Sequence, residues 1–336
     1  MRELLERARR ERVFSAAAWS VGTLDGPVNR GFLGTRSWDG PPVTEDALWD
    51  LASVTKPIVG LAVLALVERG ELGLDDPVAA RLPAYRGGDK AAITVRQLLT
   101  HTSGLPGRTP LWREHRTRDA LLEALRTRPL PAAPGSRAEY SSQGFILLGL
   151  IAEAATGRSL DALVAELVCG PAGMTETRFG AERARAVATE HCAWRGCVVA
   201  GQVHDENAVV LGEIAGHAGL FGTLADLERL GRVLVGGGPP LLEPGTLKQM
   251  ATCHTEGLGP RRGLAWQLVD PGSPMATALG PNAYGHTGFT GTSLWVDPDT
   301  GRYFVLLTNR VHPTREGTGI ERVRRDFHAR AVLVES

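Results

Sequence analysis

The sequence predicts an α+β protein in which one antiparallel sheet is built from both ends of the chain. Strand patterns rich in β-branched and aromatic residues occur early, within residues 15–34, and again late, within residues 263–308. The region between them carries helical patterns and loops. With 336 residues, 43% of them hydrophobic, the chain can bury a large core, and a disordered chain is excluded.

Each predicted element follows from a local pattern. The charged start of the chain buries Leu4, Leu5 and Ala8 on one side, which predicts an amphipathic surface helix. A hairpin follows, with strands at 15–23 and 28–34 joined at Asp25-Gly26-Pro27. Helices are predicted for residues 53–69, 94–100, 119–126, 143–155, 161–168 and 224–234. Later strands are predicted for residues 263–269, 283–288, 292–296 and 303–308, before a closing helix at 321–333.

This order of elements predicts two interdependent subdomains. Residues 1–52 and 255–336 would form a discontinuous α/β subdomain, and residues 53–254 a mainly helical one. We expect the active site at their junction, and neither part should fold alone.

Charge and composition point to a small-molecule partner. The 37 basic and 37 acidic residues cancel, which argues against a nucleic-acid binder. Charges interrupt the first twelve residues, so no apolar core of a secretory signal is visible. The most apolar run, residues 58–67, is about half of the ~20 residues needed to cross a bilayer. The expectation is therefore a cytoplasmic protein with no membrane partner, unless a leader has been removed.

The cysteines do not suggest a metal site. None of the four has the C-x2-C spacing of a zinc knuckle, and a chain of this size needs no disulfides. We therefore expect reduced, mostly buried thiols at Cys169, Cys192, Cys197 and Cys253.

The segment Ser53-Val-Thr-Lys56 carries the strongest chemical signal. Positions i and i+3 of a helix share a face, so the Ser53 hydroxyl would lie beside the Lys56 amine. A serine hydroxyl needs an adjacent base to become a nucleophile. The chain contains only three lysines against 34 arginines, and arginine cannot deprotonate. The alternative is an N-cap serine beside an ordinary surface lysine.

Three further segments occur with this pair: Leu98-Leu-Thr-His-Thr-Ser-Gly-Leu105, Tyr140-Ser-Ser142 before Gly144-Phe-Ile-Leu-Leu-Gly149, and His286-Thr-Gly288. Together they resemble the serine β-lactamase and penicillin-binding protein superfamily, especially class C-like enzymes, D-alanyl-D-alanine peptidases and related esterases. The resemblance covers nearly the whole chain. It implies the β-lactamase/transpeptidase-like fold, with an antiparallel sheet flanked by helices and an all-helical insertion.

The resemblance also implies roles for individual residues. Ser53 would be the nucleophile, Lys56 its base, and Tyr140 a second proton-transfer group, although Tyr140 could instead be a core tyrosine with a satisfied hydroxyl. Ser142 stands where many relatives have an asparagine that steers the acyl-side amide of the substrate, and a serine hydroxyl is shorter.

The last motif implies the substrate and oxyanion contacts. His286 replaces the commoner lysine and would be positively charged only part of the time at pH 7. Thr287 would hydrogen-bond a substrate carboxylate or carbonyl, and Gly288 would let the substrate approach the backbone. The N–H groups of Ser53 and Phe289 would form the oxyanion hole.

The segments containing His204, Asp205 and His217 could suggest a metal site, but their spacing matches no metalloprotease signature and the acylation machinery needs no metal. We expect no cofactor, and instead a loop fixed by a hydrogen bond of Asp205 or His217. Asn309-Arg310 after the last strand is interpreted as structural, and His101 as packing a turn.

The leading functional hypothesis is a serine acyl-enzyme hydrolase acting on a small ester or amide. A cytoplasmic transacylase of natural-product or antibiotic biosynthesis, using an amine or alcohol as the acyl acceptor, is the alternative. A non-catalytic penicillin-binding sensor is a third, less favoured hypothesis. The loops at 108–118 and 257–262 are predicted to set substrate choice.

Overall fold

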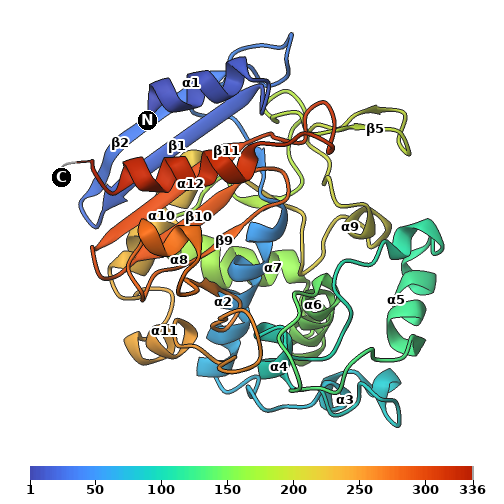
Figure 1. Ribbon diagram of the computed structural model, residues 1–336. Helices are drawn as coiled ribbons and strands as arrows, with labels where there is room; N and C mark the ends of the chain where they lie inside the picture. Colours follow the sequence, from blue (N-terminus) through green and yellow to red (C-terminus); the bar gives the residue numbers. More distant parts are fainter. Residues whose placement is uncertain (335–336) are drawn as a thin grey trace.

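The computed structural model describes residues 1–334 and contains a six-stranded antiparallel sheet (Figure 1). Its strand order is β2-β1-β11-β10-β9-β8. The strands are β1 (Ala16–Thr23), β2 (Gly26–Gly34), β8 (Gln267–Leu268), β9 (Tyr284–Thr287), β10 (Ser293–Asp297) and β11 (Arg302–Thr308). β1 pairs with β11, so the early hairpin and the late strands join in one sheet, as the sequence predicts.

Helices cover both faces of this sheet. The two terminal helices, α1 (Arg2–Arg10) and α12 (Ile320–Ala331), lie together on one face (Figure 1). Alternate residues of β11 point to opposite sides: Phe304 and Leu306 pack under these helices, while Val305 and Leu307 belong to the larger core. On the opposite face α10 (Leu224–Val235) packs against β1, β10 and β11. α10 lies within residues 53–254, the range predicted for the helical subdomain, and it packs against the sheet of the predicted α/β subdomain.

Two long buried helices form the centre of the helical part. α2 (Thr55–Glu68) is buried at twelve of its residues, and it contacts α6 (Ser142–Thr156). Around them lie α3 (Val78–Arg81), α4 (Val95–Leu99), α5 (Arg118–Thr127), α7 (Leu160–Val164), α8 (Gly170–Ala172), α9 (Glu206–Val210) and α11 (Pro244–Met250). Single turns occur at η1 (Ala52–Val54), η2 (Pro83–Tyr85), η3 (Leu111–Arg113) and η5 (Pro274–Thr277), and a π-helical segment, η4, at Ala165–Cys169.

Two minor sheets complete the chain. β3 (Trp49–Asp50), β7 (Leu220–Gly222) and β4 (Arg178–Phe179) form one, and β5 (His191–Cys192) with β6 (Cys197–Val198) forms a small hairpin. The pairing of β3 with β7 brings the residues just before Ser53 beside a strand far along the sequence.

Local capping interactions fix two of the helix ends. Thr94 caps α4 through a reciprocal capping box with Gln97, and Gly157 ends α6 in a left-handed conformation with φ of 69°. The predicted strand at 263–269 is wrong in extent, since only Gln267–Leu268 joins the sheet. Its first residues bind elsewhere: Leu264 N–H donates to the Met250 carbonyl, and a Cβ on Gly263 would lie 2.1 Å from the same oxygen.

The cysteines are distributed over different environments. Cys169 and Cys192 are buried, Cys253 is half-buried and Cys197 is exposed, so the prediction of buried thiols is confirmed for two of the four. Within residues 1–334, no helix is both long and apolar enough to span a bilayer.

Asn309 connects the sheet to its neighbours, and its removal should destabilise the protein. Its Oδ1 accepts from the N–H groups of Ser15 and Ala16 at 3.1 and 3.0 Å, and its Nδ2 donates to Ser15 Oγ and the Ala188 carbonyl. Asn309→Ala would leave these buried groups unpaired, so we expect urea unfolding to show a loss of about 2–4 kcal/mol.

Asn282→Ala is the control, because Asn282 is an exposed asparagine bonded to Asp299. Its loss should cost less than about 1 kcal/mol. Equal losses for the two variants would contradict a structural role for Asn309.

Candidate active site

The turn that carries Ser53 is fixed by a buried carboxylate. Ser53 lies in η1, directly after Ala52, whose φ of 47° is in the left-handed region that costs a non-glycine residue about 1–2 kcal/mol. Asp50 Oδ1 accepts the Ala52 N–H at 2.8 Å, and its Oδ2 accepts the His204 N–H at 2.7 Å. Burial raises the pKa of Asp50 despite the opposing effects of His204 and the two N–H groups.

The three side chains predicted to react lie in hydrogen-bond contact. Lys56 Nζ lies 3.1 Å from Ser53 Oγ, and the Tyr140 hydroxyl lies 2.8 Å from the same oxygen. Lys56 has no exposed surface, and its amine also donates to the His217 carbonyl at 2.9 Å. The alternative of a surface lysine on an ordinary helix is therefore wrong.

His101 fixes the segment that presents Tyr140. The buried His101 has a φ of 59°, and its Nδ1 accepts the Ser141 N–H at 3.0 Å. Its ring centroid lies 4.8 Å from that of Tyr140. Burial, with the positive charges of Arg262 and Lys56, holds the pKa of His101 well below its usual value, so the ring is a neutral acceptor. The prediction that His101 packs a turn is confirmed.

The His286-Thr287-Gly288 segment forms the end of β9 beside Ser53. His286 donates from Nδ1 to the Thr287 carbonyl at 2.9 Å. Burial, Lys56 and Arg262 hold its pKa well below the usual value, so His286 carries less charge at pH 7 than the sequence predicts. Gly288 is required by close packing, since a Cβ there would lie 2.0 Å from Thr292 Oγ1 and 2.6 Å from the Leu51 carbonyl oxygen.

Two backbone amides beside Ser53 are free. Among the described residues, neither the Ser53 N–H nor the Phe289 N–H has a hydrogen-bond partner. Phe289 is held in place, because Arg310 Nε donates to its carbonyl at 2.7 Å and Thr290 Oγ1 donates to the Asp50 carbonyl at 2.8 Å. A developing oxyanion is stabilised by free N–H donors of this kind.

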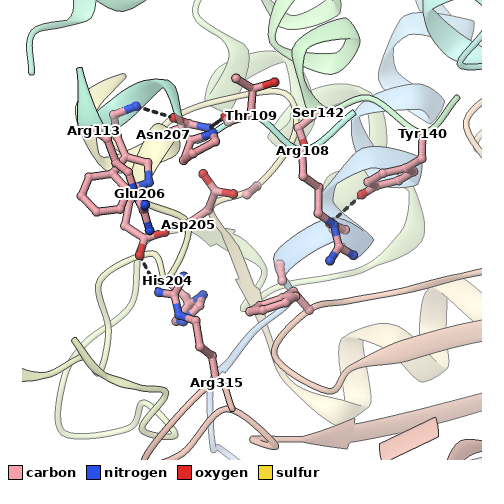
Figure 2. A pocket seen from close by; sticks show the side chains of 16 residues that line it. Arg108, Thr109, Arg113, Tyr140, Ser142, His204, Asp205, Glu206, Asn207 and Arg315 are labelled. Atoms are coloured by element: carbon pink, nitrogen blue, oxygen red, sulfur yellow. Dashed lines mark hydrogen bonds and ion pairs between the residues drawn. The ribbon is translucent and has the colours of Figure 1, made fainter. Parts of the chain in front are cut away.

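Two cavities meet at Ser53. The first, which we call the Trp112 cavity, is lined by Trp112, Arg113, Ser142, Asp205 and Asn207, among others, and Figure 2 shows its labelled side chains. The second, the Arg262 cavity, is lined by Arg262, Gln267, His286, Thr287, Arg310 and Arg324, among others. Four residues line both cavities: Ser53, Arg108, Tyr140 and Phe289.

Asp205 and His217 form a hydrogen-bonded pair. His217 Nε2 donates to Asp205 Oδ1 at 3.0 Å, and the same oxygen accepts the Ala208 N–H that opens α9. Burial would raise the pKa of Asp205, but His217 holds it well below its usual value. The predicted hydrogen-bonded loop is confirmed, and it places the His217 carbonyl against Lys56.

His204 belongs to a separate ionic cluster. Its Nε2 lies 3.1 Å from Glu190 Oε2, and Arg315 binds both Glu190 and Glu206. Over residues 1–334 no three potential ligands gather as they would around a metal ion. Sequence analysis missed Glu190 and Arg315, which lie 125 residues apart with no shared motif. It named the loops that hold Arg108 and Arg262, but not those two side chains.

Comparison with known proteins identifies the family. The profile of the β-lactamase family matches residues 1–329. A protein of Escherichia coli strain K12 named as a D-alanyl-D-alanine carboxypeptidase is 32% identical over 309 aligned residues, covering 80% of this chain and 70% of the relative. The chain therefore belongs to the β-lactamase family.

Solved structures confirm the predicted fold. EstCE1, described as a hydrolase with promiscuous acyltransferase activity, has a TM-score of 0.81 at 23% identity, covering 99% of this chain and 97% of its own. A LovD6 mutant of simvastatin synthase from Aspergillus terreus has a TM-score of 0.78 at 21% identity, covering 99% and 95%. A penicillin-binding protein homologue from Pyrococcus abyssi has a TM-score of 0.76 at 21% identity, covering 99% and 76%.

The ion pairs of Glu190 should make stability depend on acid pH. Burial would raise the pKa of Glu190, but hydrogen bonds from His204 and Arg315 lower it to about 2, against 4.5 for an ordinary glutamate. A carboxyl with a lowered folded-state pKa stabilises the protein above its unfolded pKa. That contribution is lost as pH falls from about 4.5 toward 2.

Glu190→Gln should therefore be less stable at pH 7 and lose less stability than the parent between pH 4.5 and 3, as measured by urea unfolding. Glu256→Gln, at an exposed glutamate without an ion pair, should behave as the parent. Parallel pH profiles for the parent and Glu190→Gln would contradict the assignment.

Proposed function

We propose that the protein is a serine acyl-enzyme hydrolase acting on small esters or amides. The observation that carries the proposal is the contact of Ser53 Oγ with both Lys56 Nζ and the Tyr140 hydroxyl, beside two free backbone amides. A nucleophile, two proton-transfer groups and oxyanion donors at one place are the components of acyl transfer.

Acylation would proceed in two proton transfers. Lys56 accepts the Ser53 proton while Oγ bonds to the substrate carbonyl carbon, and the Ser53 and Phe289 amides stabilise the oxyanion. Within residues 1–334 the Lys56 amine forms no salt bridge, and its hydrogen bonds go to Ser53 Oγ and the His217 carbonyl. The bond to the leaving group then breaks, and Tyr140 gives that group a proton.

Deacylation reverses these roles. A water molecule takes the place of the leaving group, gives its proton to Tyr140, which lost its own proton in acylation, and attacks the acyl-serine carbonyl, while Lys56 still holds the proton of Ser53. The bond to Ser53 Oγ then breaks and the free acid leaves, with the proton returned to Oγ.

The Arg262 cavity suggests that the leaving group carries an anion. Arg310 and Arg324 donate to the backbone carbonyls of Phe289 and Gly288, whereas the Arg262 guanidinium forms no ion pair within residues 1–334. Burial lowers the pKa of Arg262, and a partly desolvated cation without a counter-ion favours an anionic ligand. A peptide C-terminal carboxylate fits, in line with the relatives named as D-alanyl-D-alanine carboxypeptidases.

An acyl acceptor other than water would make the protein a transacylase with the same machinery. The two cavities on either side of Ser53 favour this candidate, because an amine or alcohol could occupy the Arg262 cavity after the first product leaves. Product analysis separates the two functions: consumption of an ester with no free acid formed, in the presence of a competing amine, would show transfer.

Ser53→Ala should abolish turnover. We expect ester hydrolysis to fall by at least about a thousandfold, because the covalent step is lost. A fluorophosphonate should label Ser53 in the parent, read by mass spectrometry, and should not label the variant. Unchanged melting temperature is the control for folding. A folded variant with undiminished activity would disprove the assignment, and a parent that no electrophile labels would instead support a non-catalytic sensor.

Arg262→Gln should selectively slow the hydrolysis of esters whose leaving group is anionic. The two test substrates are the acetate esters of 3-hydroxybenzoic acid and of its methyl ester. Their leaving groups differ by the methyl group that removes the negative charge. We expect kcat/KM for the anionic ester to fall about tenfold or more and that for the neutral ester to change less than about twofold. Arg261→Gln, on the same loop but absent from the cavity lining, is the matched control. Equal losses on both esters would remove the proposed anion site.

A further inference from the structure

Arg108 lies where the two cavities meet, together with the groups proposed to react. Only four residues line both cavities, and the other three are Ser53, Tyr140 and Phe289. In Figure 2 the Arg108 side chain extends from the loop near Ser142 to a place beside Tyr140. A group at this junction can contact a substrate close to its scissile bond.

The Arg108 guanidinium is free to bind. The side chain is exposed, and its charge centre lies 5.4 Å from the centroid of the Phe289 ring. Among the described residues it makes no ion pair and no hydrogen bond. Arg310, which lies 4.1 Å from the same ring centroid, is by contrast bound to two backbone carbonyls. All five N–H donors of Arg108 are therefore available.

Three other nitrogen-bearing side chains that line the Trp112 cavity are already hydrogen-bonded. The Asn207 amide donates to the Thr109 carbonyl and accepts the Trp112 N–H, both at 2.9 Å. Arg315 is paired with two glutamates, and His204 Nε2 with Glu190. Ser142 supplies only a short hydroxyl. Arg108 and Arg113 are the lining guanidinium groups with no hydrogen bond or ion pair within residues 1–334, and of these two only Arg108 also lines the Arg262 cavity with Ser53.

The cavity also contains one free acceptor. Asp205 uses Oδ1 for His217 and the Ala208 N–H, whereas its Oδ2 has no partner among residues 1–334. Figure 2 shows the Asp205 carboxylate directed into the cavity. A fixed negative charge disfavours an anionic acyl group, while an amide offers an oxygen to Arg108 and an N–H to a carboxylate.

We propose that Arg108 is a specificity-determining residue that hydrogen-bonds the amide carbonyl nearest the scissile carbonyl on the acyl side. The acyl donor is then an acylamino compound, such as an N-acyl amino acid ester or a peptide. This inference rests on the proposed function. Two N–H groups on one carbonyl oxygen fix the rotation of the acyl chain, so that the scissile oxygen faces the amides of Ser53 and Phe289.

The test uses two p-nitrophenyl esters with acyl chains of equal length: N-acetylglycinate, which has the acyl-side amide, and pentanoate, which lacks it. Arg108→Ala should lower kcat/KM for the N-acetylglycinate by about tenfold or more, because a charge-assisted hydrogen bond is lost. Its effect on pentanoate should stay below about twofold. Arg108→Lys should restore only part of the loss, since lysine lacks the planar fork.

Two further variants sharpen the test. Adding Ser142→Asn to Arg108→Ala supplies a new amide donor on the same wall, and should recover at least about threefold on N-acetylglycinate alone. Arg116→Ala is the matched control: Arg116 lies on the same loop and stacks 5.3 Å from the Trp112 centroid, but does not line the cavity. It should discriminate the two esters as the parent does.

The outcomes separate the two proposals. Equal losses on both esters in Arg108→Ala, or a loss that follows the leaving-group charge of the hydroxybenzoate esters, would overturn the Arg108 assignment and leave the hydrolase intact. If no ester reacts and Ser53 resists labelling, the proposed function fails. Calorimetry with N-acetylglycinamide then still tests the role of Arg108. The Arg108 proposal predicts that this ligand binds the parent about tenfold more tightly than it binds Arg108→Ala.

Discussion

The site depends on one buried amine held from two sides. Lys56 lies between Ser53 Oγ and the carbonyl of His217, a residue 161 positions later in the chain. A flexible lysine side chain becomes a directed base only when its rotamers are restricted. Burial restricts the aliphatic part of the Lys56 side chain, and the His217 carbonyl accepts a hydrogen bond from its amine. The position of that carbonyl is in turn fixed by the hydrogen bond from the His217 ring to Asp205. The Asp205 carboxylate therefore both lines the Trp112 cavity and helps to orient the Lys56 amine.

Three segments converge on the residues just before the nucleophile. Asp50 binds the backbone of Ala52 and of His204, while Thr290 and Thr292 donate to the carbonyls of Asp50 and Leu51 at 2.8 and 3.0 Å. The turn after β9 therefore cannot move relative to Ser53 without breaking buried hydrogen bonds. This fixes the backbone around Ser53 relative to that around Phe289, whose N–H groups have no hydrogen-bond partner within residues 1–334. The close approach of Gly288 to Leu51 belongs to the same constraint.

The sequence predicts what depends on local pattern and short spacing. Helices α2, α4, α5 and α6, the strands β9, β10 and β11 and the Ser53–Lys56 contact follow from periodicity or from positions three residues apart. The ion pairs of Glu190 with Arg315 do not, because their partners are 125 residues apart and arginine is common throughout this chain. Arg108 and Arg262 could not be predicted from the sequence for a related reason. Neither guanidinium forms an ion pair or a hydrogen bond within residues 1–334, and only the folded structure shows this. The strand expected at 263–269 is shortened because Gly263 and Leu264 pack against the end of α11.

The distribution of charge around Ser53 follows from the different chemistry of the basic side chains. Burial, Lys56 and Arg262 all lower the pKa of His286, because a charge on this ring would be desolvated and would lie close to other basic groups. His286 resolves this by remaining neutral, as its lowered pKa indicates. Arginine cannot release its proton, so Arg262 keeps the positive charge that a motif lysine would supply in the commoner arrangement. In this chain the motif residue in β9 is a histidine, and the permanent cation near it is Arg262, on the loop before β8. There it can attract a ligand while the residue beside the nucleophile stays uncharged.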